Sequence, residues 1–170
     1  MYSPFQKPLR SLAKQLKLFL IDCDGVLTDN HVSVSADAEA AGFSVRDEGA
    51  IFLMKQAGII PLVVSGRDSA YAETFCKRND VRCYTGVRDK KTFILELMVN
   101  EYFGTPIETV AYMGDGLADI EIMRSVGLSI AVADAIDAVK EVATLVTQAK
   151  GGQHAVWEAA QTILDARNSK

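Results

Sequence analysis

Residues that commonly bind metal ions or form disulfides are scarce in this sequence. Its 170 residues include three cysteines, Cys23, Cys76 and Cys83, and two histidines, His31 and His154. The cysteine count is odd, no two cysteines have C-x-x-C spacing, and the histidines lie far apart, which argues against a disulfide framework and against a Cys/His zinc site. We interpret the cysteines as reduced thiols of a cytoplasmic protein.

An excess of positive charge and a long apolar run are also missing. The net charge is −4 and the sequence pI is about 5.2, so the basic surface typical of nucleic-acid-binding proteins is absent. No stretch approaches the ~20 consecutive apolar residues of a membrane span. Basic residues precede the apolar run Leu18–Ile21, as in a secretory signal, but Asp22 and Asp24 end that run and no small-residue cleavage site follows. We therefore expect a short surface helix before the first strand, and neither a nucleic-acid nor a membrane partner.

The remaining composition fits one globular domain over residues 1–170. Hydrophobic residues make up 49% and charged residues 24% of the chain, which are ordinary values. A chain of this length buries roughly 70% of its unfolded surface, so its core needs no disulfide or structural metal. No internal repeat, low-complexity tract or linker divides the sequence.

Short apolar runs alternate with helical patterns, and together they predict an α/β fold: a three-layer, doubly wound parallel sheet whose strands are buried on both faces. On the helix after the first strand, Ile51, Phe52 and Met54 are expected to face the core. The predicted strands are Leu18–Cys23, Ile59–Val64, Val81–Tyr84, Thr109–Met113 and Leu128–Val132. The predicted helices are Glu48–Ala57, Asp68–Arg78, Lys91–Phe103, Asp119–Ser125, Ala135–Ala143 and His154–Arg167.

One segment interrupts this alternation. Between Asp29 and Arg46, two short stretches, Val32–Val34 and Gly42–Val45, are separated by polar and small residues. This pattern predicts a β-hairpin flap over about residues 29–46, which projects from the first strand–helix connection. A tail follows the last strand over about residues 150–170.

Polar residues follow four of the predicted strands, at the sheet edge where open α/β sheets bind ligands. Carboxylates gathered there repel one another unless a cation lies among them, and hard oxygen ligands favour Mg²⁺. A lysine and a strand-end serine suit a phosphate group; one Asp could attack phosphorus and another, two residues later, could protonate the leaving oxygen. The groups are Asp22-Cys23-Asp24-Gly25, Ser65-Gly66-Arg67, the segment from Thr85 to Lys90, and Gly114-Asp115-Gly116 with Asp119.

Each of these groups alone would be an ordinary turn or surface charge, and their order on four strands is the informative signal. Spacing excludes three other motifs. An EF-hand loop needs Asp-x-Asp-x-Asp-Gly after a helix, whereas Gly25 directly follows Asp24 after a strand. Neither a P-loop nor a G-x-G-x-x-G dinucleotide turn is present.

In this order the motifs resemble those of the haloacid dehalogenase superfamily of phosphohydrolases. The first motif is represented by Asp22-Cys23-Asp24-Gly25-Val26-Leu27-Thr28-Asp29, the second by Ser65, the third by Lys90 and the fourth by Gly114 to Asp119. Over nearly the whole chain the sequence is similar to the capless branch, which includes phosphatases of 3-deoxy-D-manno-octulosonate 8-phosphate and of related nonulosonate 9-phosphates. The segments that carry this closer likeness are residues 43–47, 65–67, 110–115, 126–135 and Gly151-Gly152.

The resemblance implies a site and an assembly. Asp22 would be the nucleophile and Asp24 the general acid/base, with Mg²⁺ held by the Asp22 carboxylate, the Asp24 backbone carbonyl and Asp115. A homotetramer is implied, in which a neighbouring subunit covers the site and the 29–46 hairpin joins the subunits. For the remaining roles, Ser65 and Lys90 would bind the phosphoryl oxygens, Asp119 would support the metal shell, and Arg46, Asp47, Gly66 and Arg67 would lie on the substrate side. Lys90 fits the family's Gly-x-x-x-Lys spacing from Gly86 better than Lys91 does.

The sequence departs from the branch at two places. Gly116 stands where the octulosonate phosphatases often have a second Asp, and the tail has Gln153 and Trp157 in place of two arginines. Arginine is the usual bidentate partner of a carboxylate, so the exact sugar phosphate stays open; His154 and Trp157 either form a different pocket or pack. Two other functions also stay open: a catalytically silent oligomerisation module, and a signalling receiver domain, which would carry its phosphorylated Asp where Tyr84-Thr85-Gly86 stands.

Overall fold

A computed structural model describes residues 6–169 and contains a six-stranded parallel sheet. The strands lie in the order β5-β4-β1-β6-β7-β8. All four side chains of β1 are buried, as are all five residues of β6, because helices cover both faces of the sheet. The strands are β1 (Leu18–Ile21), β4 (Ile60–Val64), β5 (Arg82–Tyr84), β6 (Val110–Gly114), β7 (Leu128–Ala131) and β8 (Leu145–Val146).

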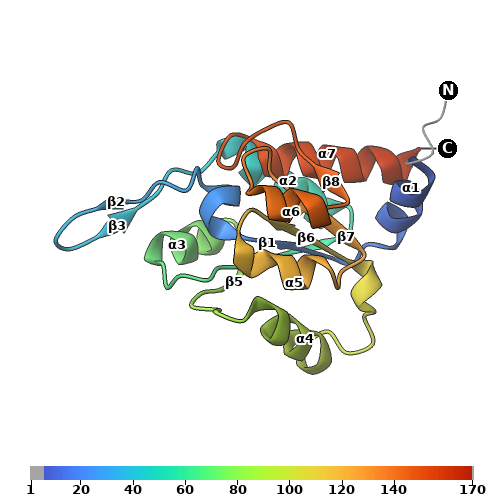
Figure 1. Cartoon of the computed structure of the whole chain (residues 1–170), viewed down its shortest axis with the longest axis horizontal. Coiled ribbons are helices and arrows are strands. Elements are labelled where there is room, and N and C mark those ends of the chain that lie inside the picture. The colour runs from blue at the N-terminus through green and yellow to red at the C-terminus, as the bar shows by residue number, and fades with distance from the viewer. Residues whose placement is uncertain (1–5, 170) are drawn as a thin grey trace.

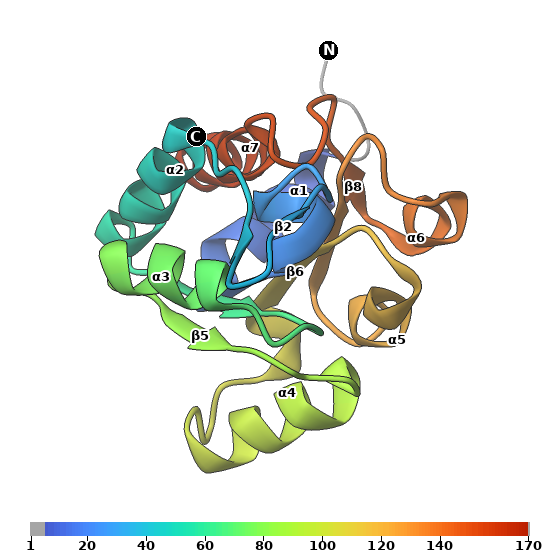
Figure 2. The same ribbon diagram turned by 90° about the vertical axis from the view of Figure 1, so that its left-hand side faces the viewer.

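The helices form one layer on each side of this sheet, so the predicted three-layer, doubly wound fold is confirmed (Figures 1 and 2). On one side lie α1 (Gln6–Gln15), α2 (Val45–Gln56), α3 (Ala70–Arg78) and α7 (Ala155–Asn168); α7 contacts both α1 and α2. On the other side lie α4 (Lys90–Asn100), α5 (Ile120–Met123) and α6 (Asp137–Val142). In the described part of the chain, no helix is both long and apolar enough to cross a membrane.

The predicted hairpin is present, but its second arm was placed wrongly. Strands β2 (Ser33–Val34) and β3 (Glu39–Ala40) pair antiparallel and project from the body of the molecule (Figure 1). The second arm was expected at Gly42–Val45. Instead, Phe43 stacks on Phe75 and Val45 begins α2. All four strand residues of the hairpin are exposed. The alternation of buried and exposed side chains that would locate the strands in the sequence is therefore missing.

Two further expectations differ from the structure. Ile51 and Met54 are buried as expected, but Phe52 is 59% exposed. Consecutive helix residues point about 100° apart, so Phe52 cannot share the face of Ile51. Strand β8 was not predicted, because two apolar residues after a helix give no recognisable strand pattern.

Candidate active site

The turn that follows β1 carries Asp22 and brings the backbone close to a second acid. Asp22 continues the sheet for one residue, because its backbone N–H donates to the carbonyl of Met113 at 3.0 Å. Gly25 then adopts φ +83°, and a Cβ built there would lie 2.1 Å from Asp115 Oδ2. Only glycine fits at this position, because it tolerates the left-handed conformation and leaves room for the Asp115 carboxylate.

Three carboxylates and one ammonium group meet at this edge of the sheet. Carboxylate oxygens of Asp22, Asp115 and Asp119 lie within 4.8 Å of one another. The Lys90 Nζ lies 2.8 Å from Asp22 Oδ1 and 2.7 Å from Asp119 Oδ1, and its side chain is 3% exposed. Lys91, the other candidate, points elsewhere and pairs with Glu121 at 3.5 Å. The first residue of α4 therefore supplies the lysine of the cluster.

The electrostatics of the cluster leave room for a further cation. Burial raises the pKa of Asp22 to about 8, with repulsion from Asp119 as the next cause, although Lys90 opposes the rise. Burial and Asp119 also raise the pKa of Asp115 to about 6. Burial alone would lower the pKa of Lys90, but Asp22 and Asp119 raise it above the ordinary value. One ammonium group therefore does not neutralise the three acids, and their oxygen atoms are the ligands that Mg²⁺ prefers.

Asp119 is engaged by its own surroundings. Its Oδ1 accepts hydrogen bonds from Lys90 Nζ and from Tyr112 Oη, each at 2.7 Å. Its Oδ2 accepts from the backbone N–H groups of Asp115 at 3.0 Å and Gly116 at 2.9 Å. This carboxylate therefore organises the loop after β6 and fixes Lys90. Sequence reasoning missed Tyr112; the available signal was a single hydroxyl in an otherwise apolar strand.

Asp24 lies outside this acidic cluster and is held by a different set of residues. Tyr71 Oη donates a hydrogen bond to Asp24 Oδ1 at 2.7 Å. The Nε atom of Arg67 lies 4.0 Å from Asp24 Oδ2, and Arg67 Nη2 donates to Glu39 Oε2 at 2.9 Å. Burial, followed by the hydrogen bond to Asp24, raises the pKa of Tyr71 to about 12, so its hydroxyl is a neutral donor. No sequence pattern pointed to Tyr71 or Glu39, because neither follows a strand of the parallel sheet.

Ser65 and Gly66 complete the edge at the end of β4. Ser65 is fully buried, and its Oγ accepts a hydrogen bond from the backbone N–H of Arg67 at 3.2 Å. A Cβ built at Gly66 would lie 3.9 Å from the Lys90 side chain. The residues predicted to follow β1, β4, β5 and β6 therefore converge at one edge of the sheet.

The tail packs on the turn after β1. Gly152 adopts φ +68° and donates its N–H to the Val26 carbonyl at 2.9 Å. A Cβ built at Gly151 would lie 1.9 Å from the Gly25 carbonyl oxygen. His154 Nδ1 lies 2.7 Å from Ser44 Oγ, at the start of α2. Within the described chain, Gly151 and Gly152 therefore support the turn after β1, and His154 packs against the start of α2.

Of the two residues expected on the substrate side at the start of α2, one does not fit. Asp47 is fully buried, and its Oδ1 accepts a hydrogen bond from the Trp157 backbone N–H at 2.8 Å, in the first turn of α7. A carboxylate that is enclosed between two helices cannot contact a substrate, so the substrate-side role expected for Asp47 was wrong. Arg46 is exposed, and its role stays a prediction.

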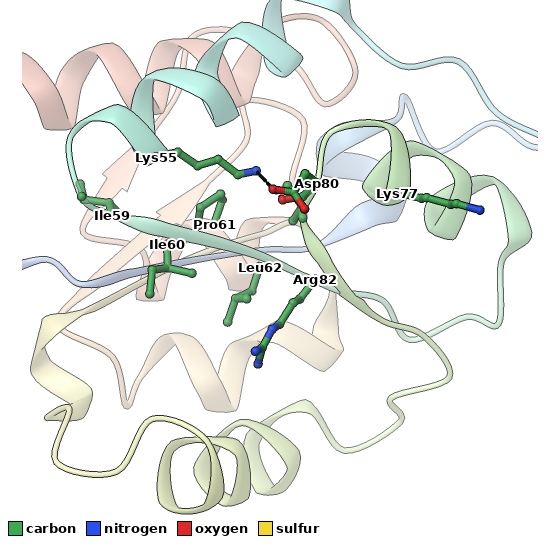
Figure 3. A pocket seen from close by; sticks show the side chains of 10 residues that line it. Lys55, Ile59, Ile60, Pro61, Leu62, Lys77, Asp80 and Arg82 are labelled. Atoms are coloured by element: carbon green, nitrogen blue, oxygen red, sulfur yellow. Dashed lines mark hydrogen bonds and ion pairs between the residues drawn. The ribbon is translucent and has the colours of Figure 1, made fainter.

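Of two cavities in the described part of the chain, neither is lined by a predicted site residue, but one is lined by Tyr71, which contacts Asp24. A cavity of about 570 Å³ lies at the start of β4; its Lys55 pairs with Asp80 at 3.3 Å, and Lys77 points away from it (Figure 3). None of the predicted site residues lines it. A second cavity, of about 490 Å³, is lined by Glu39 and Tyr71 among others, and Tyr71 connects it to Asp24.

Comparisons with known proteins identify the family. The haloacid dehalogenase-like hydrolase model matches residues 85–159. The 3-deoxy-D-manno-octulosonate 8-phosphate phosphatases of Salmonella typhi and Escherichia coli K12 are 33% and 32% identical over 168 residues, which cover 98% of this chain and 88% of each relative. The corresponding Moraxella catarrhalis enzyme, solved with magnesium, phosphate and KDO, is 31% identical with a TM-score of 0.89, covering 94% of this chain and 92% of that one. A cobalt-bound Haemophilus influenzae relative is 34% identical with a TM-score of 0.86, covering 92% and 91%. The chain therefore belongs to the haloacid dehalogenase-like hydrolases, in the capless phosphatase branch that its motifs predicted.

Proposed function

We propose that this protein is a Mg²⁺-dependent phosphatase that hydrolyses a phosphorylated 3-deoxy ulosonic acid through an aspartyl-phosphate intermediate. The observation that carries the proposal is the buried Lys90, which bridges Asp22 and Asp119 beside Asp115 at the carboxyl ends of the strands. Similarity to octulosonate 8-phosphate phosphatases supports the substrate class.

The metal would be held by the Asp22 carboxylate, the Asp24 backbone carbonyl and Asp115. This all-oxygen set fits Mg²⁺. Because Gly25 has no Cβ, the Asp115 carboxylate can lie against the turn that carries Asp22 and Asp24. When bound, the ion would offset the negative charge of the phosphate and of the acids around it. Asp119 would act indirectly, by fixing Lys90 and the loop that carries Asp115.

The chemistry then follows from the protein's own groups. Asp22 attacks phosphorus, and the bond to the ester oxygen breaks while Asp24 gives that oxygen a proton. Asp24 next takes a proton from water as the water oxygen attacks the aspartyl-phosphate, which releases phosphate and restores Asp22. Lys90, the Ser65 hydroxyl and the Gly66 backbone bind the phosphoryl oxygens during both steps.

The sugar acid would be recognised mainly by Arg67. Its side chain is 50% exposed and stands between Glu39 and Asp24, beside the proposed acid/base. A guanidinium group binds a carboxylate through two parallel hydrogen bonds. Because Gln153 and Trp157 replace two arginines of the related tails, a nonulosonate 9-phosphate or another small sugar phosphate is the second candidate substrate.

A panel of phosphate esters tests the proposal. Octulosonate 8-phosphate, nonulosonate 9-phosphates and simple hexose phosphates are incubated with the purified chain, with and without Mg²⁺, and released phosphate is measured. We expect Mg²⁺-dependent release that is fastest with a 3-deoxy ulosonate ester and is abolished by Asp22→Asn, whose circular dichroism should match wild type. Turnover by Asp22→Asn at the wild-type rate would rule out the nucleophile, and no release from any ester would favour a silent oligomerisation module.

We further propose a cytoplasmic homotetramer in which a neighbouring subunit covers the site. The hairpin supports this, because its strand residues are all exposed and Val34 is 73% exposed in the single chain. Sedimentation analysis should give a mass of four chains, and Val34→Lys should shift it to smaller species. A wild-type monomer with full activity would rule out the shared site.

A further inference from the structure

The hydroxyl group of Tyr71 is placed to fix one oxygen of Asp24. Tyr71 lies in the first turn of α3 and is 8% exposed. Its ring lies 6.3 Å from that of Phe43, which stacks on Phe75 with 4.2 Å between the ring centroids. These aromatic contacts leave the Tyr71 ring little freedom. The hydroxyl therefore reaches Asp24 Oδ1, at 2.7 Å, from a rigid base.

We propose that Tyr71 is a positioning residue for Asp24, a role that rests on the proposed function. Asp24 must give a proton to the leaving group and later take one from water. Because Tyr71 Oη donates to Oδ1, the transferred proton is carried by Oδ2 in both steps. Without the hydroxyl, the carboxyl group can rotate about its bond to Cβ, and either oxygen can take the proton.

This role makes the effect of Tyr71 depend on the leaving group. A sugar alkoxide leaves slowly unless it receives a proton, so the first chemical step needs a well-placed Asp24. Nitrophenolate is stable without a proton, so the same step on p-nitrophenyl phosphate does not need it. Since kcat/KM covers the steps up to the first irreversible one, it reports transfer of the phosphoryl group to Asp22 for both esters.

The experiment compares kcat/KM of wild type and Tyr71→Phe on the preferred sugar phosphate and on p-nitrophenyl phosphate. We expect a loss of about tenfold on the sugar phosphate, the size of one hydrogen bond to a charged group, and less than twofold on the aryl ester. A second variant, Tyr71→Leu, removes the same hydroxyl with different packing and should give the same difference. Tyr84→Phe is the matched control, because its hydroxyl donates to the exposed Glu101, and it should leave both values unchanged.

Three results would overturn the inference. The first is an equal loss of kcat/KM on both esters, and the second is no loss of kcat/KM on either ester. The third is loss of the fold in both Tyr71 variants. The first and third results would give Tyr71 a structural role, and the second would give it no role. Wild-type protein and the Asp24→Asn variant, assayed alongside, distinguish failure of this inference from failure of the proposed function. If wild type hydrolyses neither ester, the proposed function fails and the inference fails with it; if wild type is active and Asp24→Asn is not, a missing difference overturns the inference alone.

Discussion

Replacing Lys90 with methionine tests how the cluster is held together. The Lys90 ammonium group lies within 2.8 Å of two carboxylates and its side chain is 3% exposed. Removing one partner of a buried ion pair costs about 3–5 kcal/mol, because the remaining charge stays buried and unpaired. Methionine keeps most of the volume of the side chain, so the loss is mainly electrostatic. For a chain of this length, we expect a fall in Tm on the order of 10 °C.

The pH dependence of this loss follows from the acids. Burial and repulsion raise the pKa of Asp22 in the folded protein, and removal of Lys90 raises it further. A carboxyl group whose folded pKa is raised binds its proton more tightly in the folded state, so stability is lost as the pH rises through that pKa. Because the folded pKa of Asp22 is about 8 while Lys90 is present, the destabilisation by Lys90→Met should be smaller at about pH 6 and should grow as the pH rises through about 8 toward about 9.

Urea unfolding without metal, at several pH values, measures the effect, and the ester panel measures activity. We expect Lys90→Met to abolish phosphate release. The adjacent Lys91→Met is the matched control, because Lys91 pairs with the exposed Glu121 at 3.5 Å, and exposed pairs contribute less than about 1 kcal/mol. If Lys90→Met matched Lys91→Met in stability at about pH 9, the buried bridge between Lys90 and the two carboxylates would not hold the cluster together.

Two further predictions concern the structure around the site. Burial raises the pKa of Asp47 to about 6, so its ionisation destabilises the fold by about 3 kcal/mol as the pH rises from 4 to 8. Urea unfolding of Asp47→Asn should show a smaller loss of stability over that range, and parallel curves for the two proteins would contradict this. Gly151→Ala should lower both Tm and activity, because its Cβ would lie 1.9 Å from the Gly25 carbonyl oxygen. An unchanged Tm would show that the tail moves away from the turn at no cost in stability. The control is Gly42→Ala, because no atom lies within 4 Å of a Cβ built at Gly42.

The strand ends could be predicted from sequence because two independent patterns coincide there. Buried parallel strands are continuous apolar runs, and each run stops where polar residues begin, as at Asp22, Ser65 and Asp115. Parallel strands bring all their carboxyl ends to one edge, so the order of the motifs was enough to place them together. Lys90 was placed by its spacing from Gly86, which the structure explains: Lys90 opens α4 and its side chain turns inward.

The supporting residues could not be predicted, because they act across the fold. Tyr112, Tyr71 and Glu39 contact the predicted site from a strand, a helix and the hairpin, through side chains whose direction depends on packing. Asp47 was misassigned for the same reason, since a carboxylate near the motifs in sequence is turned toward α7 in the structure. Phe52 was assigned to the core because it is large and apolar and lies close in sequence to the buried Ile51 and Met54. Helix geometry turns its side chain outward.

Two further segments, the hairpin and the tail, also contact the surroundings of the predicted site. The hairpin reaches Asp24 through Glu39 and Arg67, and the tail reaches the Asp22 turn through Gly151 and the Gly25 carbonyl. The exposed hairpin is thus connected to the proposed acid/base by two ion pairs, Glu39–Arg67 and Arg67–Asp24. A neighbouring subunit that packs on the hairpin would therefore hold Asp24 in place as well as cover the site. In the proposed tetramer, subunit contacts would in this way affect the acid/base step.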